Sequence, residues 1–394
     1  MKNRWVILGA GIVIQIILGG LYAWSTFFPS LIKNYSLTKE ECGFIFGLSV
    51  GVFALVTNLA GWLLSKKGPR ITAFVGSILF VIGYMIASRS GGDYHTLILG
   101  LSVFIGSGIG FAYVCPLSVG MKWFPKKKGL VTGVAVAGFG GGAVLLSNAT
   151  QYFLNSGMNI LELFKWIAIV PGGVLVVATL FLSDPPQEKT GDGKTASFGD
   201  AWSLPFGVLL LGMFSGTFAG LLVIGHITSI IVDSGFTAQQ AVTAVSLLAI
   251  GNAIGRVTWG WVFDKIHYKC IPLSLGLFSA LMMGLVFANS PNFYYVLATL
   301  IGFCFGGCFV IYATAVSSYF GTESFSRLYP LCMLSYGVAG LTGPKIGGRI
   351  ADTTGSYDTA LYLSFGILIV AAIITGIGLI AFKNVEKEQK EEIK

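Results

Sequence analysis

Long stretches without a charged residue recur along this chain. The first lies between Arg4 and Lys33 and holds only apolar and neutral polar residues. A helix needs about 20 mostly apolar residues to cross the hydrocarbon core of a bilayer. The stretches therefore predict membrane-spanning helices. We expect twelve of them, at residues 5–28, 42–64, 71–88, 96–120, 130–154, 161–183, 202–232, 239–262, 271–289, 294–320, 328–350 and 358–382.

The composition excludes most water-soluble classes of protein. Only 11% of the 394 residues are charged, whereas soluble chains carry about 25%. The hydrophobic share is 54% and the mean hydropathy is +0.79. Soluble enzymes, nucleic-acid-binding proteins and disordered chains are therefore excluded. The first span is too long for a removable signal peptide and lacks a small-residue cleavage site.

Lysine and arginine residues predict the orientation, because they are enriched in the cytoplasmic loops of membrane proteins. With the N-terminus inside, eighteen of the 25 fall on the cytoplasmic side and six on the outer side. Both termini are therefore predicted to be cytoplasmic, in a protein of the plasma (inner) membrane. The net charge of +8 reflects this topology and anionic lipid rather than a nucleic-acid partner. The remaining cation, Arg256, lies within a span.

One long polar segment interrupts the hydrophobic pattern near the middle of the chain. Residues 183–200 are rich in proline, glycine and charge, which is typical of a flexible linker. The sequence thus predicts a six-helix half at 1–183, a cytoplasmic linker at 184–201, a second six-helix half at 202–382 and a cytoplasmic tail at 383–394.

The two predicted halves share residues at a constant offset of 199 positions. Each half has a capping-box pattern, in which a threonine satisfies free N–H groups at a helix start. Several independent pairs at one offset indicate an internal repeat. The pairs are Thr38/Thr237, Glu41/Gln240, Gly61-Trp62/Gly260-Trp261, Lys66/Lys265 and Tyr113/Tyr312. Two six-helix halves in parallel repeat resemble the major facilitator superfamily, which implies an all-α integral membrane fold.

The ends of two spans, with the loops that follow, resemble a signature of that superfamily, G-x-x-x-D-[RK]-x-G-[RK]-[RK]. Residues 260–269 carry the second-half copy. Residues 61–70 carry the first-half copy, although Ser65 stands where the family has its aspartate. The resemblance implies loops that lock the halves in one conformation, and positive-inside anchoring explains the same charges. The implied gating residues are Lys66, Arg70, Asp264 and Lys265.

Longer stretches narrow the resemblance to the monocarboxylate transporters and the oxalate–formate antiporters. Residues 122–140 are similar to that family's W/Y-F-P-x-K/R-R-G-L-A-x-G run, which enters a glycine-rich fifth helix. Residues 343–357 resemble its stretch from helix eleven into the next loop, and residues 22–24 also fit. The resemblance covers the whole chain and implies the transport of small carboxylates.

Arg256 is the strongest candidate for a binding residue. No compensating carboxylate lies in its predicted span. A guanidinium at membrane depth is costly unless it faces water or a partner, and its planar donors suit a carboxylate. Asp264 lies eight residues on, about 12 Å along a helix, which makes it a poor ion-pair partner. In the resembled family an arginine of the eighth helix binds the substrate carboxylate.

His226 is the one histidine of three that falls within a predicted span. An imidazole titrates near neutral pH, so it can donate to a substrate or take up a transported proton. A packed, hydrogen-bonded core histidine is the alternative. Because no other group of the expected cavity titrates near neutrality, we predict a substrate-binding and proton-coupling role.

Four tyrosines are candidates for the wall of a substrate cavity. A phenolic hydroxyl can orient a small acid while the ring forms the wall, although each ring alone also suits packing. Asn252 precedes Arg256 by one helical turn and is expected to steady its guanidinium. The tyrosines are Tyr22, Tyr113, Tyr312 and Tyr336, of which Tyr113 and Tyr312 are related by the repeat.

Two departures from the resembled family bear on the substrate. Oxalate carriers have a lysine at the position aligned with Tyr336, and Lys345 is nine residues further, about 13 Å along a helix. With Arg256 as the one cation, charge balance favours a monocarboxylate such as lactate, pyruvate, acetate or formate. Animal monocarboxylate carriers also have an aspartate at the position of Asn252 and a lysine in helix one, which is uncharged here. Proton coupling then falls to His226 or to the substrate carboxylate paired with Arg256.

We therefore expect a proton-coupled symporter of small monocarboxylates that works by alternating access, with a carboxylate anion antiporter as the alternative. The expected partners are the substrate, protons and the lipid bilayer, with no nucleic acid, and the chain is expected to act as a monomer.

Other classes of function fit the sequence less well. No cofactor or metal site is expected, because Cys304 and Cys308 are one helical turn apart without a nearby histidine or carboxylate. An intramembrane enzyme would need a clustered catalytic set, which the scattered His95, His226 and His267 do not supply. A sensor on a transporter fold usually adds a large signalling domain, for which the linker and tail are too short.

Overall fold

The computed structural model describes residues 4–124, 128–185 and 203–379. All regular elements within these ranges are helices, and each of the twelve predicted spans overlaps one of them. Most of the predicted linker and the whole predicted tail lie outside the described residues. The expectation of an all-α fold is confirmed.

The helices before the linker form the first half of the molecule. A 3-10 segment and a π-helical segment interrupt the regular geometry of two spans. In chain order the elements are α1 (Arg4–Gly19), the 3-10 helix η1 (Gly20–Phe27), α2 (Phe28–Tyr35), α3 (Lys39–Ser88), α4 (Tyr94–Leu97), the π-helix η2 (Ile98–Phe104), α5 (Ile105–Trp123), α6 (Lys128–Asn155) and α7 (Ile160–Leu180).

The helices after the linker form the second half. They are α8 (Leu204–Asp233), α9 (Ala238–Ile266), the 3-10 helix η5 (His267–Lys269), α10 (Cys270–Val286), α11 (Pro291–Thr354) and α12 (Asp358–Gly378).

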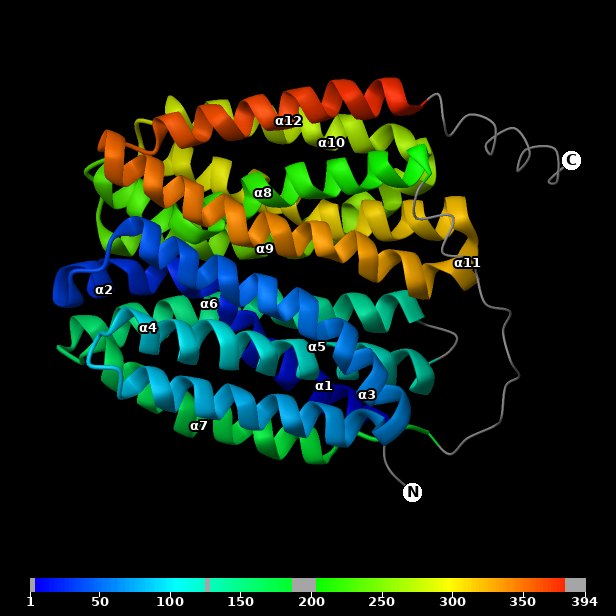
Figure 1. The fold of residues 1–394 in the computed structure, drawn as a ribbon, viewed down its shortest axis with the longest axis horizontal. Coiled ribbons are helices and arrows are strands. Elements are labelled where there is room, and N and C mark those ends of the chain that lie inside the picture. Colours follow the sequence, from blue (N-terminus) through cyan, green and yellow to red (C-terminus); the bar gives the residue numbers. More distant parts are fainter. Residues whose placement is uncertain (1–3, 125–127, 186–202, 380–394) are drawn as a thin grey trace, which may run out of the picture.

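Two of these helices each cover two predicted spans. In α3 the helix bends at Gly68, whose φ of 78° is left-handed, and Pro69 follows directly. Glycine adopts this conformation without a steric penalty, so the predicted boundary between 42–64 and 71–88 is a kink rather than an extended loop. The second, α11, covers 294–320 and 328–350 and turns back on itself, as the yellow to orange ribbon shows (Figure 1).

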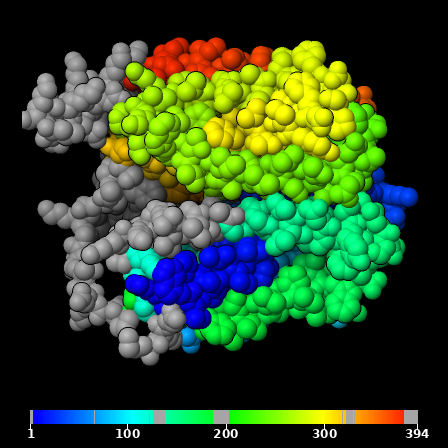
Figure 2. Space-filling view, turned by 180° about the vertical axis from the view of Figure 1, so that it is seen from behind, coloured from blue at the N-terminus to red at the C-terminus, as the bar shows by residue number. Residues whose placement is uncertain are grey.

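The two halves lie side by side as separate bundles of roughly antiparallel helices (Figures 1 and 2). Helix α3 contacts α11, and α6 contacts α9, across the boundary between the halves. We call these contacts the α3–α11 seam and the α6–α9 seam. Helix α1 begins and α12 ends at the same end of the molecule, on the right of Figure 1. We call this the terminal end, and the other, where α3 and α9 begin, the distal end.

The internal repeat is visible in the backbone at the distal end. Both predicted capping boxes are confirmed: the Thr38 hydroxyl accepts from the N–H of Glu41 at 3.1 Å, and that of Thr237 accepts from Gln240 at 3.3 Å. A left-handed residue lies two positions before each box, Ser36 (φ 58°) in one half and Gly235 (φ 89°) in the other, 199 positions apart. The two halves therefore turn the chain in the same way before α3 and α9.

The outside of the molecule suits a lipid environment. Nine described stretches are long and apolar enough to cross a bilayer, and one of them, Ala238–Val286, covers two predicted spans. Large apolar side chains point outward, such as Val257, which is 70% exposed, and Phe287, which is 64% exposed. Apolar surface on this scale would not be solvated by water, so the prediction of an integral membrane protein is supported.

Candidate functional site

Arg256 lies near the middle of α9, about 27 Å along the helix from its first residue. Its Nε donates a hydrogen bond to Oδ1 of Asn252 at 3.0 Å, and Asn252 is itself buried. The guanidinium carbon lies 4.7 Å from the ring centroid of Phe309 in α11, in a cation–π contact. Asn252 and Phe309 thus orient a half-buried guanidinium at mid-depth, between α9 and α11.

Within the described part of the chain, no carboxylate neutralises this cation. The two ion pairs found there are Lys39–Asp233 and Lys122–Asp184, and neither involves Arg256. An amide and an aromatic face offset only part of the cost of placing a guanidinium at this depth. The positive charge is therefore available to an anionic ligand.

An aromatic cluster surrounds the midpoint of the boundary between the halves. Its rings meet edge to face, at centroid distances of 5.2 Å for Tyr22–Phe139, 5.2 Å for Phe53–Tyr113 and 5.2 Å for Phe309–Tyr336. Both halves contribute, because Tyr22 also contacts Phe305 at 5.8 Å. The aromatic cluster comprises Tyr22, Phe53, Tyr113, Phe139, Phe305, Phe309 and Tyr336.

Two phenolic hydroxyls connect the halves inside this cluster. The hydroxyl of Tyr22 in η1 lies 3.3 Å from that of Tyr336 in α11, and both side chains are buried. Each of these tyrosines lies within electrostatic range of Arg256, as does Tyr329 about two turns earlier in α11. The structure therefore brings Tyr22, Tyr113, Tyr336, Asn252 and Arg256 into one region, as predicted for a common cavity.

His226 lies elsewhere. It is fully buried in α8, nearer the distal end than Arg256 by about 16 Å along the helix axes. Its Nε2 is 2.7 Å from the backbone oxygen of Pro344, and its Nδ1 is 3.0 Å from the hydroxyl of Tyr357. Because a carbonyl only accepts, Nε2 carries the hydrogen and Nδ1 accepts from Tyr357. In this conformation both ring nitrogens are occupied by the protein.

Tyr312 also lies outside the aromatic cluster. It is fully buried inside the second half, with its hydroxyl against Gly212 of α8 and its ring near Cys308 and Cys332. Its repeat partner Tyr113 instead contacts Phe53 and Phe139 at the boundary between the halves. The repeat therefore gives the two tyrosines equivalent sequence positions but different surroundings, because Gly212 leaves room for a ring next to α8.

The four predicted gating residues lie exposed at the terminal end. Lys66 and Lys265 each lie over the tryptophan that ends the same span, at 4.5 Å from Trp62 and 6.0 Å from Trp261. Arg70 donates from Nε to the backbone oxygen of Leu182 in its own half, at 3.2 Å. The fourth residue, Asp264, takes part in neither ion pair found among the described residues.

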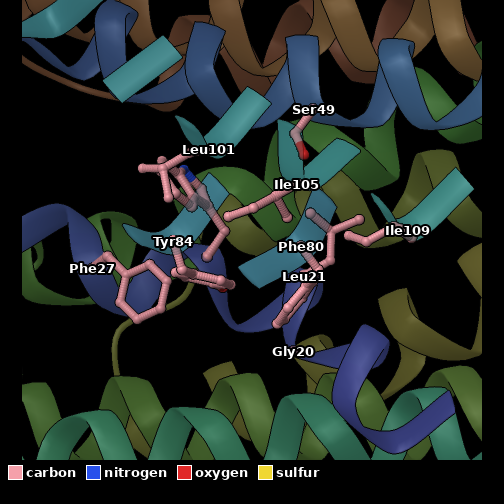
Figure 3. Close-up of a pocket in the computed structure, with 10 residues that line it drawn as sticks. Gly20, Leu21, Phe27, Ser49, Phe80, Tyr84, Leu101, Ile105 and Ile109 are labelled. Atoms are coloured by element: carbon pink, nitrogen blue, oxygen red, sulfur yellow. The ribbon is translucent and has the colours of Figure 1, made fainter. Parts of the chain in front are cut away.

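A small pocket within the first half lies apart from Arg256. It is lined by residues of η1, α3, η2 and α5, almost all apolar, and the hydroxyl of Ser49 points into it (Figure 3). That hydroxyl is buried and has no hydrogen-bond partner among the described residues. Without a cation in its lining, this pocket does not suit a carboxylate.

Sequence reasoning missed several residues around Arg256. Phe309, which carries the cation–π contact, is one of 30 phenylalanines, and no spacing distinguishes it. Tyr329 was missed for a similar reason, although its hydroxyl donates to the backbone oxygen of Phe309 at 3.3 Å. Their depth along the helices could have indicated them. Both ends of α11 lie at the distal end, and Phe309 and Tyr336 each lie about 27 Å along α11 from the nearer end. This is the same depth as that of Arg256.

Comparison with known proteins agrees with the fold and the repeat. The sequence matches the Major Facilitator Superfamily over residues 11–326 and 208–394. A solved bacterial homologue of the human lysosomal transporter Spinster, in an inward-facing and occupied conformation, superposes with a TM-score of 0.77 at 15% identity, over 98% of each chain.

Curated relatives cover nearly the whole chain. It is 28% identical to the uncharacterised transporter YhjX of Escherichia coli, over 86% of each chain. The oxalate:formate antiporter of Oxalobacter formigenes is 24% identical, over 92% of this chain and 88% of the relative, and human monocarboxylate transporter 11 is 24% identical, over 95% and 82%. The resemblance found from the motifs is confirmed, and the chain belongs to the major facilitator superfamily of membrane-spanning transporters.

Proposed function

We propose that this chain is a proton-coupled symporter of small monocarboxylates, of the lactate, pyruvate, acetate and formate class. The observation that carries the proposal is the single guanidinium of Arg256, which lies at mid-depth with no carboxylate partner among the described residues. One buried cation balances one carboxylate. A dicarboxylate would leave a negative charge among aromatic rings, which is costly at membrane depth.

The surroundings of Arg256 suit a small acid with a short apolar body. Asn252 uses the Nε donor, so the two terminal nitrogens can bind a carboxylate end-on in a bidentate pair. The rings of the aromatic cluster offer apolar walls, and the hydroxyls of Tyr22 and Tyr336 offer polar contacts. A few placed polar groups among apolar walls are typical of small-molecule sites.

We propose that transport proceeds by rocking of the two halves, with the terminal end cytoplasmic. The contacts that join the two halves through Tyr22–Tyr336 and Asn148–Ser246 lie at the distal end or at the level of the aromatic cluster. At the terminal end Lys66, Arg70 and Lys265 contact residues of their own half. This arrangement supports a state that is closed to the outside.

His226 is proposed as the proton-coupling residue, acting through the closed distal end rather than by contact with the substrate. Both ring nitrogens are engaged with Pro344 and Tyr357, so a proton arriving on Nδ1 would displace the hydrogen bond from Tyr357. The alternative carrier of the proton is the substrate carboxylate paired with Arg256.

Transport into proteoliposomes tests the coupling. Labelled lactate or formate should enter faster when the outside is more acidic, and His226→Asn should remove this stimulation by a pH gradient. Tyr35→Phe is a matched control, because its hydroxyl bonds to Asn159 at the same end but not to His226. Uptake that does not depend on the pH gradient, together with exchange of preloaded anion, would instead support the alternative, a carboxylate antiporter. The relative from Oxalobacter formigenes is named as such an antiporter.

A further inference from the structure

Asp352 connects the two halves at the distal end. It lies in the last turn of α11, and its Oδ1 and Oδ2 accept hydrogen bonds from the backbone N–H groups of Lys39 at 3.2 Å and Glu40 at 2.8 Å. These are the first two residues of α3, in the other half. The carboxylate of one half thus caps the N-terminus of a helix in the other.

The position of Asp352 is unfavourable for its own helix. A negative charge in the last turn opposes the helix dipole, and α11 has no basic residue there to offset it. The same charge is favourable at the N-terminus of α3, where free N–H groups point outward. Asp352 therefore gains its stabilisation from the opposite half.

Lys39 adds a second connection at the same place. Its ammonium forms an ion pair with Asp233 of α8 and lies 5.1 Å from the ring centroid of Tyr357. Exposed ion pairs of this kind contribute little, whereas hydrogen bonds from backbone N–H groups to a carboxylate are charge-assisted. Asp352 is exposed as well, so we rank the cap first for its two hydrogen bonds to backbone N–H groups and not for burial.

The backbones approach closely enough to make the cap possible. A Cβ at Gly348, one turn before Asp352, would overlap the backbone oxygen of Lys39, and one at Gly43 would overlap that of Pro344. Glycine at these positions lets α11 lie directly against α3. Both contacts join α3 to α11 at the distal end, so separating the halves there would break them.

We propose that Asp352, bound to the N-terminus of α3, is a latch that holds the distal end closed and that must release before this end opens. The latch is defined by Asp352 and the N–H groups of Lys39 and Glu40. It is a property of the moving halves and does not depend on which anion is carried.

Cysteine labelling tests the latch without substrate, so its failure is distinct from failure of the proposed function. Ser25 of η1 is buried between the halves, and its Oγ accepts from Thr228 of α8 across the boundary at 3.1 Å. In Ser25→Cys, a membrane-impermeant maleimide applied to intact cells should react slowly. Asn34→Cys, at an exposed position of the same end, should react at once and shows that the reagent reaches it.

Adding Asp352→Ala should raise the labelling rate of Ser25→Cys by at least about tenfold, since hydrogen bonds to a charged group are worth about one factor of ten or more. Asp352→Asn should give a smaller increase, and Asp358→Asn, which changes a carboxylate at the start of α12, should give none. All six native cysteines are buried, but Cys42 lies three residues from Lys39 in the α3–α11 seam. Every variant therefore also carries Cys42→Ser, and in this background Asp352→Ala without Ser25→Cys must stay unlabelled. If this control is labelled, the Asp352→Ala variant has unfolded, and Asp352→Asn becomes the decisive variant. A higher labelling rate of Ser25→Cys in the presence of Asp352→Asn then supports the latch. The latch is refuted if the decisive variant leaves the labelling rate of Ser25→Cys unchanged while Asn34→Cys still reacts.

Discussion

The α3–α11 seam and the α6–α9 seam join the same two halves with different contacts. In the α3–α11 seam the backbones touch, and a Cβ at Gly47 would overlap the backbone oxygen of Gly340. In the α6–α9 seam side chains meet instead, as Nδ2 of Asn148 donates to the hydroxyl of Ser246 at 3.1 Å. The repeat relates the two seams, because Gly47 and Ser246, and likewise Gly141 and Gly340, are each 199 positions apart.

This difference shows that the repeat determines which helices meet at the boundary between the halves, but not how closely their backbones pack. Glycine at positions 47 and 340 permits a close approach of α3 and α11. In the other seam Ser246 stands at the position that matches Gly47, and a Cβ at Gly141, which matches Gly340, would meet nothing within 4 Å. The latch at Asp352 lies only on the α3–α11 seam; its repeat counterpart is Phe153, which has no carboxylate. We infer that the α3–α11 seam carries most of the distal closure.

Among the substitutions that compare the two seams, the largest effect is expected from adding one methyl group to the tighter one. Gly47→Ala should separate α3 from α11, because overpacking costs about 1–3 kcal/mol. We expect the labelling rate of Ser25→Cys to rise about tenfold. The matched control is Gly140→Ala in the looser seam, where a Cβ would lie 3.1 Å from the oxygen of Ala249 and should change the rate about twofold or less. Equal effects at Gly47 and Gly140 would refute the difference between the seams.

A smaller effect is expected where the α3–α11 seam reaches the aromatic cluster. Tyr336→Phe removes the hydroxyl contact with Tyr22 and keeps the ring. Loss of one neutral hydrogen bond of about 0.5–1.5 kcal/mol should raise KM for the carboxylate about threefold to tenfold. On the same helix, Tyr312→Phe should leave KM unchanged, since that hydroxyl lies outside the cluster. If Tyr312→Phe changed KM and Tyr336→Phe did not, Tyr336 would not be part of the binding site.

The smallest effect is expected in the α6–α9 seam itself. Asn148→Ala removes an exposed neutral hydrogen bond to Ser246. Solvent competes for such a bond, so the uptake rate and the labelling of Ser25→Cys should each change by about twofold or less. A tenfold change in either measurement would show that this seam, too, holds the distal end closed.

Much of the fold could be predicted from the sequence, because lipid imposes a simple length rule on helices. The capping boxes at Thr38 and Thr237 marked two helix starts correctly. The two spans at 42–64 and 71–88 were predicted, but not the form of their connection, because the left-handed Gly68 followed by Pro69 gives a kink where a loop was expected. The low helix propensity of glycine and proline signals a break in a helix, but it does not indicate how the chain continues after the break.

The site was predictable in part, for a physical reason. Arg256 was identifiable because a lone cation at membrane depth is rare. Its contact with Phe309 was not, because it depends on how α9 packs against α11. The distance between His226 and Arg256 was likewise unpredictable, as both lie within spans and only their helix depths separate them. Asp352 went unrecognised as a connection between halves, because its partners are backbone groups of Lys39 and Glu40.

The central claim is that Arg256 binds the transported carboxylate. Its most direct measurement is the initial uptake of labelled lactate or formate into proteoliposomes that contain Arg256→Ala. Loss of a charge-assisted pair of about 1.5–3 kcal/mol should lower kcat/KM by about tenfold to a hundredfold. Lys345→Ala, which removes a cation that lies over Phe44 in the α3–α11 seam, should retain uptake. Uptake by Arg256→Ala at the rate of the unmodified chain would contradict the account.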